Sequence, residues 1–156
     1  MTAPSTSNAA RIASELMRRH MMALAPDDTL SAAFQMIRLS RVRQLPVLDG
    51  QTIVGEVSHL DTFLAYRDIL EAGAKLDPAA VEDAIGEVNA RSVQTIMRPV
   101  VHFVSPEATV DQIVRSLRER RAGFVPVVVE TGDGGLRIMG IVTETDLLAA
   151  ALGRPS

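Results

Sequence analysis

Apolar residues recur at helical spacing in two stretches of the chain, each introduced by a threonine. After Thr29 and after Thr109, apolar side chains return every three or four positions. This spacing is typical of an amphipathic helix, and a preceding threonine favours the N-cap position. The apolar helical positions are Leu30, Phe34 and Ile37 in the first stretch and Val110, Ile113, Val114 and Leu117 in the second.

Each predicted helix is followed by two short apolar runs separated by turn residues. The first pair of runs surrounds Asp49-Gly50, and the second surrounds the longer turn at 131–135. Short apolar runs joined by Gly-containing turns predict β-hairpins. Pro46 and Pro126 lie inside the first strand of each hairpin, which favours edge or terminal ladder positions because proline cannot donate a backbone hydrogen bond.

A capping-box pattern closes each hairpin and introduces a further predicted helix. Ser58 stands three residues before Asp61, and Thr143 stands three residues before Asp146. In a capping box the hydroxyl accepts from the third helical amide, and the acid accepts from the N-cap amide. The pattern alone leaves open whether these acids serve the helices or a ligand.

These matching patterns belong to an internal repeat. Residues 16–47 align with residues 96–127, and the alignment resumes after five extra residues in the second copy. Such self-similarity indicates a duplicated structural unit. The identical pairs include Met17/Met97, Arg18/Arg98, Pro26/Pro106, Thr29/Thr109, Pro46/Pro126, Gly55/Gly140 and Asp61/Asp146.

A separate helix is predicted between the two copies. Asp77 and Pro78 suit its N-cap and first positions, and Val81, Ile85 and Val88 keep helical spacing. We therefore expect a flexible N-terminal segment (1–13), a first unit (14–67), a helical connector (68–92) and a second unit (93–152).

Composition narrows the classes of function. The 156 residues are 47% hydrophobic, and 16 Lys and Arg against 19 Asp and Glu give a net charge of −3. Without a basic run, we expect no binding to duplex nucleic acid. No apolar run approaches the roughly 20 residues that span a bilayer, and the first residues do not resemble a signal peptide, so we expect a cytoplasmic protein without a membrane segment.

Reactive and metal-binding residues are sparse. The chain has no cysteine, which excludes disulfides and thiol chemistry. His20, His59 and His102 share no metal-ligand spacing, so no metal site is predicted. No nucleophile–base constellation is visible, and we expect no catalytic residues and no enzymatic activity.

The ordered motifs of the second copy resemble the cystathionine-β-synthase (CBS) domain. They read MRP at 97–99, VSPEATV at 104–110, VPVV at 125–128 and GIVTETDLL at 140–148, and the first copy is similar. The resemblance implies a tandem CBS pair, or Bateman module: an α/β fold of two pseudo-symmetric strand–helix–strand–strand–helix units. It also implies a homodimer.

The resemblance implies a regulatory function without a required cofactor. CBS pairs commonly bind adenosine-containing molecules (AMP, ADP, ATP or S-adenosylmethionine) in clefts between the two units and control a partner protein, which the sequence does not identify. The Asp of the S/T-x-x-D motif would receive the ribose hydroxyls, because a carboxylate accepts from both. The alternative is a ligand-free interaction or dimerisation module, in which both acids serve only as helix caps.

Family geometry combines the strand region of one copy with the S/T-x-x-D motif of the other. The implied first cleft contains Met17, Arg43, Gln44, Leu45, Thr143, Thr145 and Asp146. The implied second cleft contains Met97, Gly123, Phe124, Val125, Ser58, Leu60 and Asp61. We expect the first to bind more strongly, because it has Arg43 near the phosphate end and two hydroxyls before its acid.

Overall fold

The computed structural model describes residues 11–73 and 75–153, which form two compact units. Unit 1 contains residues up to 21, residues 51–53 and residues from 100 onward. Unit 2 contains residues 22–50 and 54–99. Each unit therefore combines chain segments from both copies of the sequence repeat.

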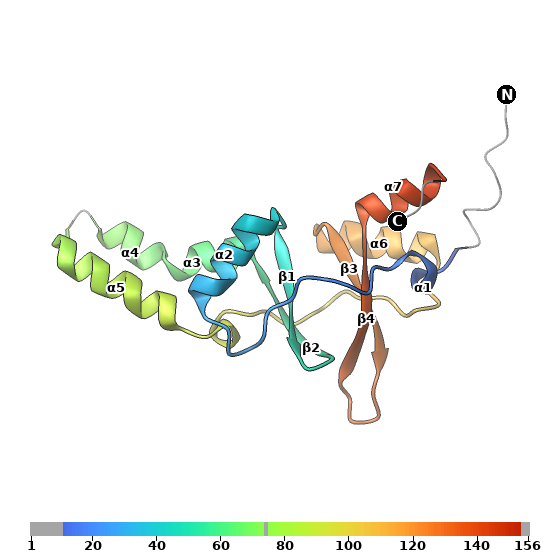
Figure 1. The fold of residues 1–156 in the computed structure, drawn as a ribbon, viewed down its shortest axis with the longest axis horizontal. Coiled ribbons are helices and arrows are strands. Elements are labelled where there is room, and N and C mark those ends of the chain that lie inside the picture. Colours follow the sequence, from blue (N-terminus) through green and yellow to red (C-terminus); the bar gives the residue numbers. More distant parts are fainter. Residues whose placement is uncertain (1–10, 74, 154–156) are drawn as a thin grey trace. The chain divides into compact units, whose positions relative to one another are not determined.

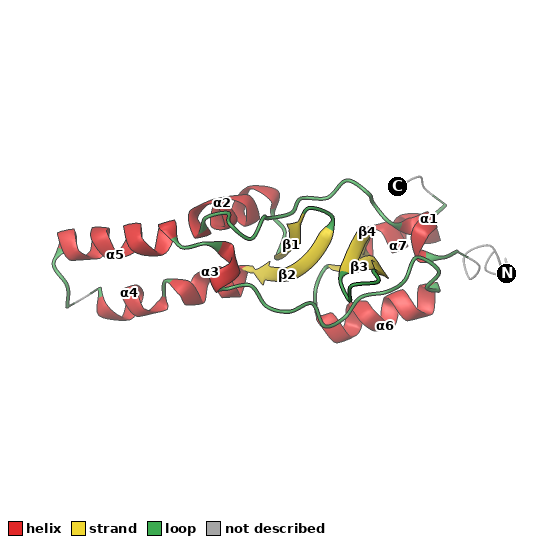
Figure 2. Ribbon diagram, turned by 90° about the horizontal axis from the view of Figure 1, so that it is seen from below, coloured by secondary structure: helices red, strands yellow, loops and turns green. Residues whose placement is uncertain are grey.

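Unit 2 is built from a hairpin and helices (Figure 1). β1 and β2 are hydrogen-bonded neighbours, and the turn between them uses Gly50 with a positive φ of 61°. Figures 1 and 2 show α4 and α5 lying side by side in this unit. Its elements are α2 (Leu30–Ser40), β1 (Gln44–Asp49), most of β2 (Thr52–Ser58), α3 (His59–Ala65), α4 (Arg67–Ala72), α5 (Pro78–Ala90) and the 3-10 turn η1 (Val93–Thr95).

Unit 1 has the corresponding hairpin, with an antiparallel register that pairs Val125 with Val142. The first residues of β2 also belong to this unit, where Thr52 pairs with Arg137 of β4. Its other elements are α1 (Ala13–Leu16), α6 (Val110–Arg120), β3 (Phe124–Glu130), β4 (Leu136–Thr143) and α7 (Glu144–Ala151).

The predicted helix starts are confirmed at the main helices. The Thr29 hydroxyl accepts from the amide of Ala32, and Thr109 forms a capping box with Gln112. The connector helix begins as expected, because Asp77 accepts from the Ala80 amide while Pro78 occupies the first turn. A side-chain acceptor at the N-cap satisfies an amide that has no partner within the helix.

The resemblance implies a leading strand before the first helix of each unit, and the structure shows it only in its shortest form. It is reduced to a parallel bridge of one residue, Leu24 with Val47 in unit 2 and Val104 with Val127 in unit 1. The backbone amide of Leu24 donates to the carbonyl of Pro46 at 2.9 Å, and the amide of Val104 donates to the carbonyl of Pro126 at 3.0 Å. A proline follows each bridge residue by two positions and has no amide to extend the ladder.

Each unit has its own apolar core. In unit 1 the buried residues include Ile113, Leu117, Val125 and Val142, and in unit 2 they include Leu24, Ile37, Leu45 and Val57. One position of a predicted stripe differs: α2 buries Leu30 and Ile37 as expected, but its third buried residue is Ala33, whereas Phe34 is 42% exposed. Helical periodicity identifies the buried stripe only to within about a residue, because side chains one position apart lie some 100° apart around the axis.

Candidate functional site

The predicted site residues are divided between the two units. Met17, Val125, Thr143, Thr145 and Asp146 belong to unit 1. Arg43, Gln44, Leu45, Ser58, Asp61 and Met97 belong to unit 2. Within its own unit, each S/T-x-x-D motif lies beside a Met-Arg segment, so each unit contains one complete local constellation.

In unit 1 the constellation centres on Asp146, the third residue of α7. One carboxylate oxygen, Oδ2, accepts from the Thr143 amide at 2.8 Å and from its hydroxyl at 2.6 Å. In return, the Thr143 hydroxyl accepts from the Asp146 amide at 3.2 Å, which completes the predicted capping box. The other oxygen, Oδ1, accepts from Nε of Arg18. The Asp146 side chain is 0% exposed, whereas that of Arg18 is 49% exposed.

In unit 2 the same arrangement is built around Asp61. Its Oδ2 accepts from the Ser58 amide at 2.7 Å and from the Ser58 hydroxyl at 2.6 Å. Nε of Arg98 lies 3.1 Å from Oδ2 and 3.1 Å from Oδ1. Here the carboxylate side chain is 12% exposed and the arginine 52%. The two acids are therefore both helix caps and both ion-pair partners, and Asp146 is the more completely covered.

The arginines are positioned by short antiparallel backbone contacts. The backbone amide of Arg18 donates to the Ile141 carbonyl at 2.8 Å, and the Arg18 carbonyl accepts from the Ile141 amide at 3.0 Å. Arg98 exchanges the same two bonds with Glu56, each at 2.9 Å. Because the main chain of each arginine is held at two points, its side chain starts from a defined position beside the acid.

The repeated glycines permit these close backbone crossings. A Cβ on Gly140 would lie 2.6 Å from the Arg18 carbonyl oxygen and 3.0 Å from Cγ and Sδ of Met17. On Gly55 it would lie 2.9 Å from Sδ of Met97 and 3.0 Å from the Arg98 carbonyl oxygen. Such distances leave no room for a side chain, so the two methionines pack where a Cβ would otherwise be.

The other predicted residues differ in accessibility. Leu45 and Val125 are core residues, 2% and 0% exposed, so their side chains are committed to packing. Arg43 and Thr145 are exposed. Gln44 has a buried Oε1 with no hydrogen-bond partner among the described residues. A buried amide oxygen without a partner is uncommon and is a feature that a ligand donor can satisfy.

Arg18 and Arg98 were missing from the residue set predicted from the sequence. The repeat alignment contains their signal, since Met-Arg occurs at the same place in both copies. Their partners lie 128 and 37 residues away along the chain, and only the folded units bring them together.

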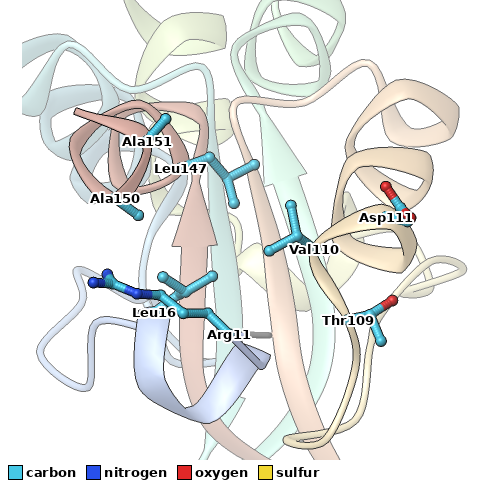
Figure 3. Close-up of a pocket in the computed structure, with 8 residues that line it drawn as sticks. All are labelled: Arg11, Leu16, Thr109, Val110, Asp111, Leu147, Ala150 and Ala151. Carbon is cyan, nitrogen blue, oxygen red and sulfur yellow. The ribbon is translucent and has the colours of Figure 1, made fainter. Parts of the chain in front are cut away.

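A separate hollow in unit 1 does not include the predicted site residues. Figure 3 shows Leu16, Val110 and Leu147 facing a cavity of about 340 Å³, with Arg11 and Asp111 at its sides. Its apolar walls are typical of a gap between packed helices, and it contains no constellation of reactive groups.

In the part of the chain that the structure describes, no three His, Asp or Glu side chains are grouped so that they could hold a metal ion. No helix among those same residues has the length and apolarity that crossing a membrane requires.

This chain belongs to the CBS-domain family. The family model for the CBS domain matches it twice, at residues 13–68 and 93–153. The two matches correspond to the two copies of the sequence repeat, so the predicted tandem CBS pair and its α/β fold are confirmed. The boundaries predicted for the individual segments remain predictions.

Known relatives and solved structures match this chain over most of its length. Hypoxic response protein 1 of Mycobacterium tuberculosis (strain CDC 1551 / Oshkosh) is 28% identical over 137 residues, which cover 86% of this chain and 81% of that protein. CBSX2 of Arabidopsis thaliana, solved in complex with AMP, is 24% identical with a TM-score of 0.66, covering 91% of this chain and 96% of its own. Hypoxic Response Protein I, solved with two coordinated zinc ions, is 23% identical with a TM-score of 0.61, covering 88% and 97%.

Proposed function

We propose that this chain is a regulatory module that binds an adenosine-containing ligand through its CBS pair and thereby controls a partner protein. The observation that carries the proposal is the pair of carboxylates, Asp61 and Asp146, held at helix starts by the same contacts in both units. Two copies of one polar constellation in a CBS pair exceed what helix capping alone requires. AMP bound to CBSX2, a protein of the same fold, supports the choice of an adenine ligand.

The ribose would bind at the S/T-x-x-D motif. A carboxylate can accept hydrogen bonds from both vicinal hydroxyls, while Thr143 and Thr145 provide hydroxyls beside it. Asp146 remains the acid expected to contribute more than Asp61. Arg43, Gln44 and the backbone of Leu45 remain the groups predicted to meet phosphate and base, and the unpartnered Oε1 of Gln44 supports a ligand that offers a donor, such as the adenine amino group.

The competing function is a ligand-free interaction module. The same hydrogen bonds also favour this function, because each acid already caps its helix and pairs with an arginine without any ligand. The two functions differ in whether the native chain gains stability from a nucleotide. A ligand that binds only the folded state adds about 2.7 kcal/mol at 100 times its dissociation constant, or about 5–11 °C in Tm for a chain of this size.

Thermal unfolding across adenosine compounds therefore tests the proposal. AMP, ADP, ATP and S-adenosylmethionine are added separately, with GMP and CMP as controls for general anion effects. The proposed function predicts a saturable rise in Tm for at least one adenine compound and a smaller rise for GMP and CMP. An unchanged Tm with all four adenine compounds at millimolar concentration would leave the interaction module as the better account.

The proposed assembly is a homodimer. In unit 2 the exposed rings of Phe34 and Phe63 line an apolar groove of about 380 Å³, together with Tyr66, Leu70 and Ile85. Exposed apolar side chains that gather in one place are typical of protein contact surfaces. A second copy of this chain is the proposed occupant, in keeping with the homodimer that the family resemblance implies.

A further inference from the structure

Arg18 covers the carboxylate to which the proposed function assigns the ribose. The Asp146 side chain is fully buried, and its Oδ1 is bonded to Arg18 while its Oδ2 is bonded to Thr143. A pair of ribose hydroxyls has no access to that carboxylate until the arginine moves. The inference rests on the proposed function, because it concerns how a ligand reaches the same acid.

The position of Arg18 over Asp146 is fixed by the fold and is not a chance surface contact. The backbone N–H and C=O of Arg18 both bond to Ile141, and Gly140 leaves the space for that close approach. The same contacts recur around Arg98 and Asp61 in the other unit, from different parts of the chain. A chance surface ion pair would not be repeated with the same glycine, methionine and arginine.

Arg18 can leave Asp146 at a small cost in free energy only if another anion pairs with its guanidinium. Arg18 is about half exposed, so its guanidinium is not locked inside the core. Releasing it from a buried carboxylate removes a charge-assisted hydrogen bond, which is stronger than a neutral one. A phosphate on the ligand would restore that bond, since the planar guanidinium suits phosphate oxygens.

We propose that Arg18 is a specificity-determining residue that selects anionic nucleotides over uncharged and cationic adenosine compounds. A ligand with both a ribose diol and a phosphate replaces both partners of the Arg18–Asp146 pair. Adenosine offers the diol but leaves the guanidinium unpaired. S-adenosylmethionine carries a sulfonium and an ammonium against a single carboxylate, so its net positive charge adds repulsion. The order of affinity is therefore AMP first, adenosine second and S-adenosylmethionine last.

Isothermal titration of AMP and adenosine tests the assignment on four full-length proteins: the unmodified chain, Arg18→Gln, Arg98→Gln and Arg19→Gln. Arg19 is the matched control, because it is the exposed neighbouring arginine and its substitution changes the net charge equally. The unmodified chain should bind AMP at least tenfold more tightly than adenosine, the factor that corresponds to one charge-assisted hydrogen bond.

In Arg18→Gln the AMP-to-adenosine ratio should fall to about threefold or less, the preference that remains being due to Arg43, and adenosine should bind more tightly than to the unmodified chain. Arg19→Gln should keep the original ratio. Adenosine that binds Arg18→Gln as weakly as the unmodified chain, or a ratio that falls equally in Arg19→Gln, overturns the proposal. If Arg18→Gln does not fold, Arg98→Gln carries the same test for the second unit.

The result also separates this inference from the proposed function. If the unmodified chain binds AMP and Arg18→Gln leaves the ratio unchanged, the proposed function stands and the role of Arg18 is wrong. If neither compound binds the unmodified chain or any variant, both are wrong. Adenosine binding that appears only in Arg18→Gln supports both.

Discussion

Gly140 provides a sharp test of the backbone crossing that positions Arg18. Substitution by alanine would place a Cβ 2.6 Å from the Arg18 carbonyl oxygen, closer than real Cβ contacts come. Relief requires the Arg18 backbone to move, and that backbone makes two hydrogen bonds to Ile141. Losing both at about 0.5–1.5 kcal/mol each predicts that Gly140→Ala lowers the free energy of unfolding by about 1–3 kcal/mol.

Two other glycines calibrate this magnitude. A Cβ on Gly55 first meets Sδ of Met97 at 2.9 Å, and a thioether can rotate away more easily than a backbone carbonyl can move. Gly55→Ala should therefore cost less than Gly140→Ala. Gly86 lies inside α5, and a Cβ there meets nothing within 4 Å, so Gly86→Ala should stabilise by about 0.5–1 kcal/mol through helix propensity.

Urea unfolding followed by circular dichroism measures all three variants against the unmodified chain. The expected order of stability is Gly86→Ala, unmodified chain, Gly55→Ala and Gly140→Ala, with similar m-values. The reasoning is refuted if Gly140→Ala is as stable as Gly86→Ala, because the close approach would then impose no constraint.

Three other predictions concern unit 2. Tyr66 is the only tyrosine in the sequence, and burial raises its pKa above 10.0, so its absorbance titration should have a midpoint above that value. The stability that this shift contributes should be present below pH 10 and lost as the pH rises through the raised pKa. Asp77→Ala should destabilise the protein by about 1 kcal/mol in denaturant unfolding, because the Ala80 amide loses its cap, whereas Asp77→Asn should retain most of that stability. Sedimentation should show a dimer at micromolar concentration, and Phe63→Glu should convert it to a 16.8 kDa monomer. Leu39→Glu should leave the dimer intact, because Leu39 is an exposed residue of α2 outside the apolar groove. A monomeric unmodified chain would contradict the proposed assembly.

Repeated patterns made much of the fold predictable. The duplicated hydroxyl–acid spacing predicted the capping boxes at Ser58 and Thr143, because a cap depends on residues only three positions apart. The connector helix was predictable for the same reason, from Asp77 and Pro78. These are local determinants, so a single sequence contains all the information they need.

The arginine partners of the two acids depend on long-range backbone pairing. Arg18 reaches Asp146 only because its segment pairs with Ile141, and no local pattern encodes that contact. The single-residue leading strands were likewise unpredictable from apolar periodicity alone, although Pro26 and Pro106 marked where they end. The exposure of Phe34 depends on which face of α2 packs, which helical spacing leaves uncertain by a residue.

The most direct test of the central claim is a comparison of AMP with 2′-deoxy-AMP by isothermal titration. The two compounds differ only in the 2′-hydroxyl, so they isolate recognition of the ribose diol by the S/T-x-x-D carboxylates. The account predicts at least tenfold weaker binding of the deoxy compound, a difference that shrinks strongly in Asp146→Asn and less in Asp61→Asn. Equal affinities of the unmodified chain for AMP and 2′-deoxy-AMP would contradict it and assign both acids to helix capping alone.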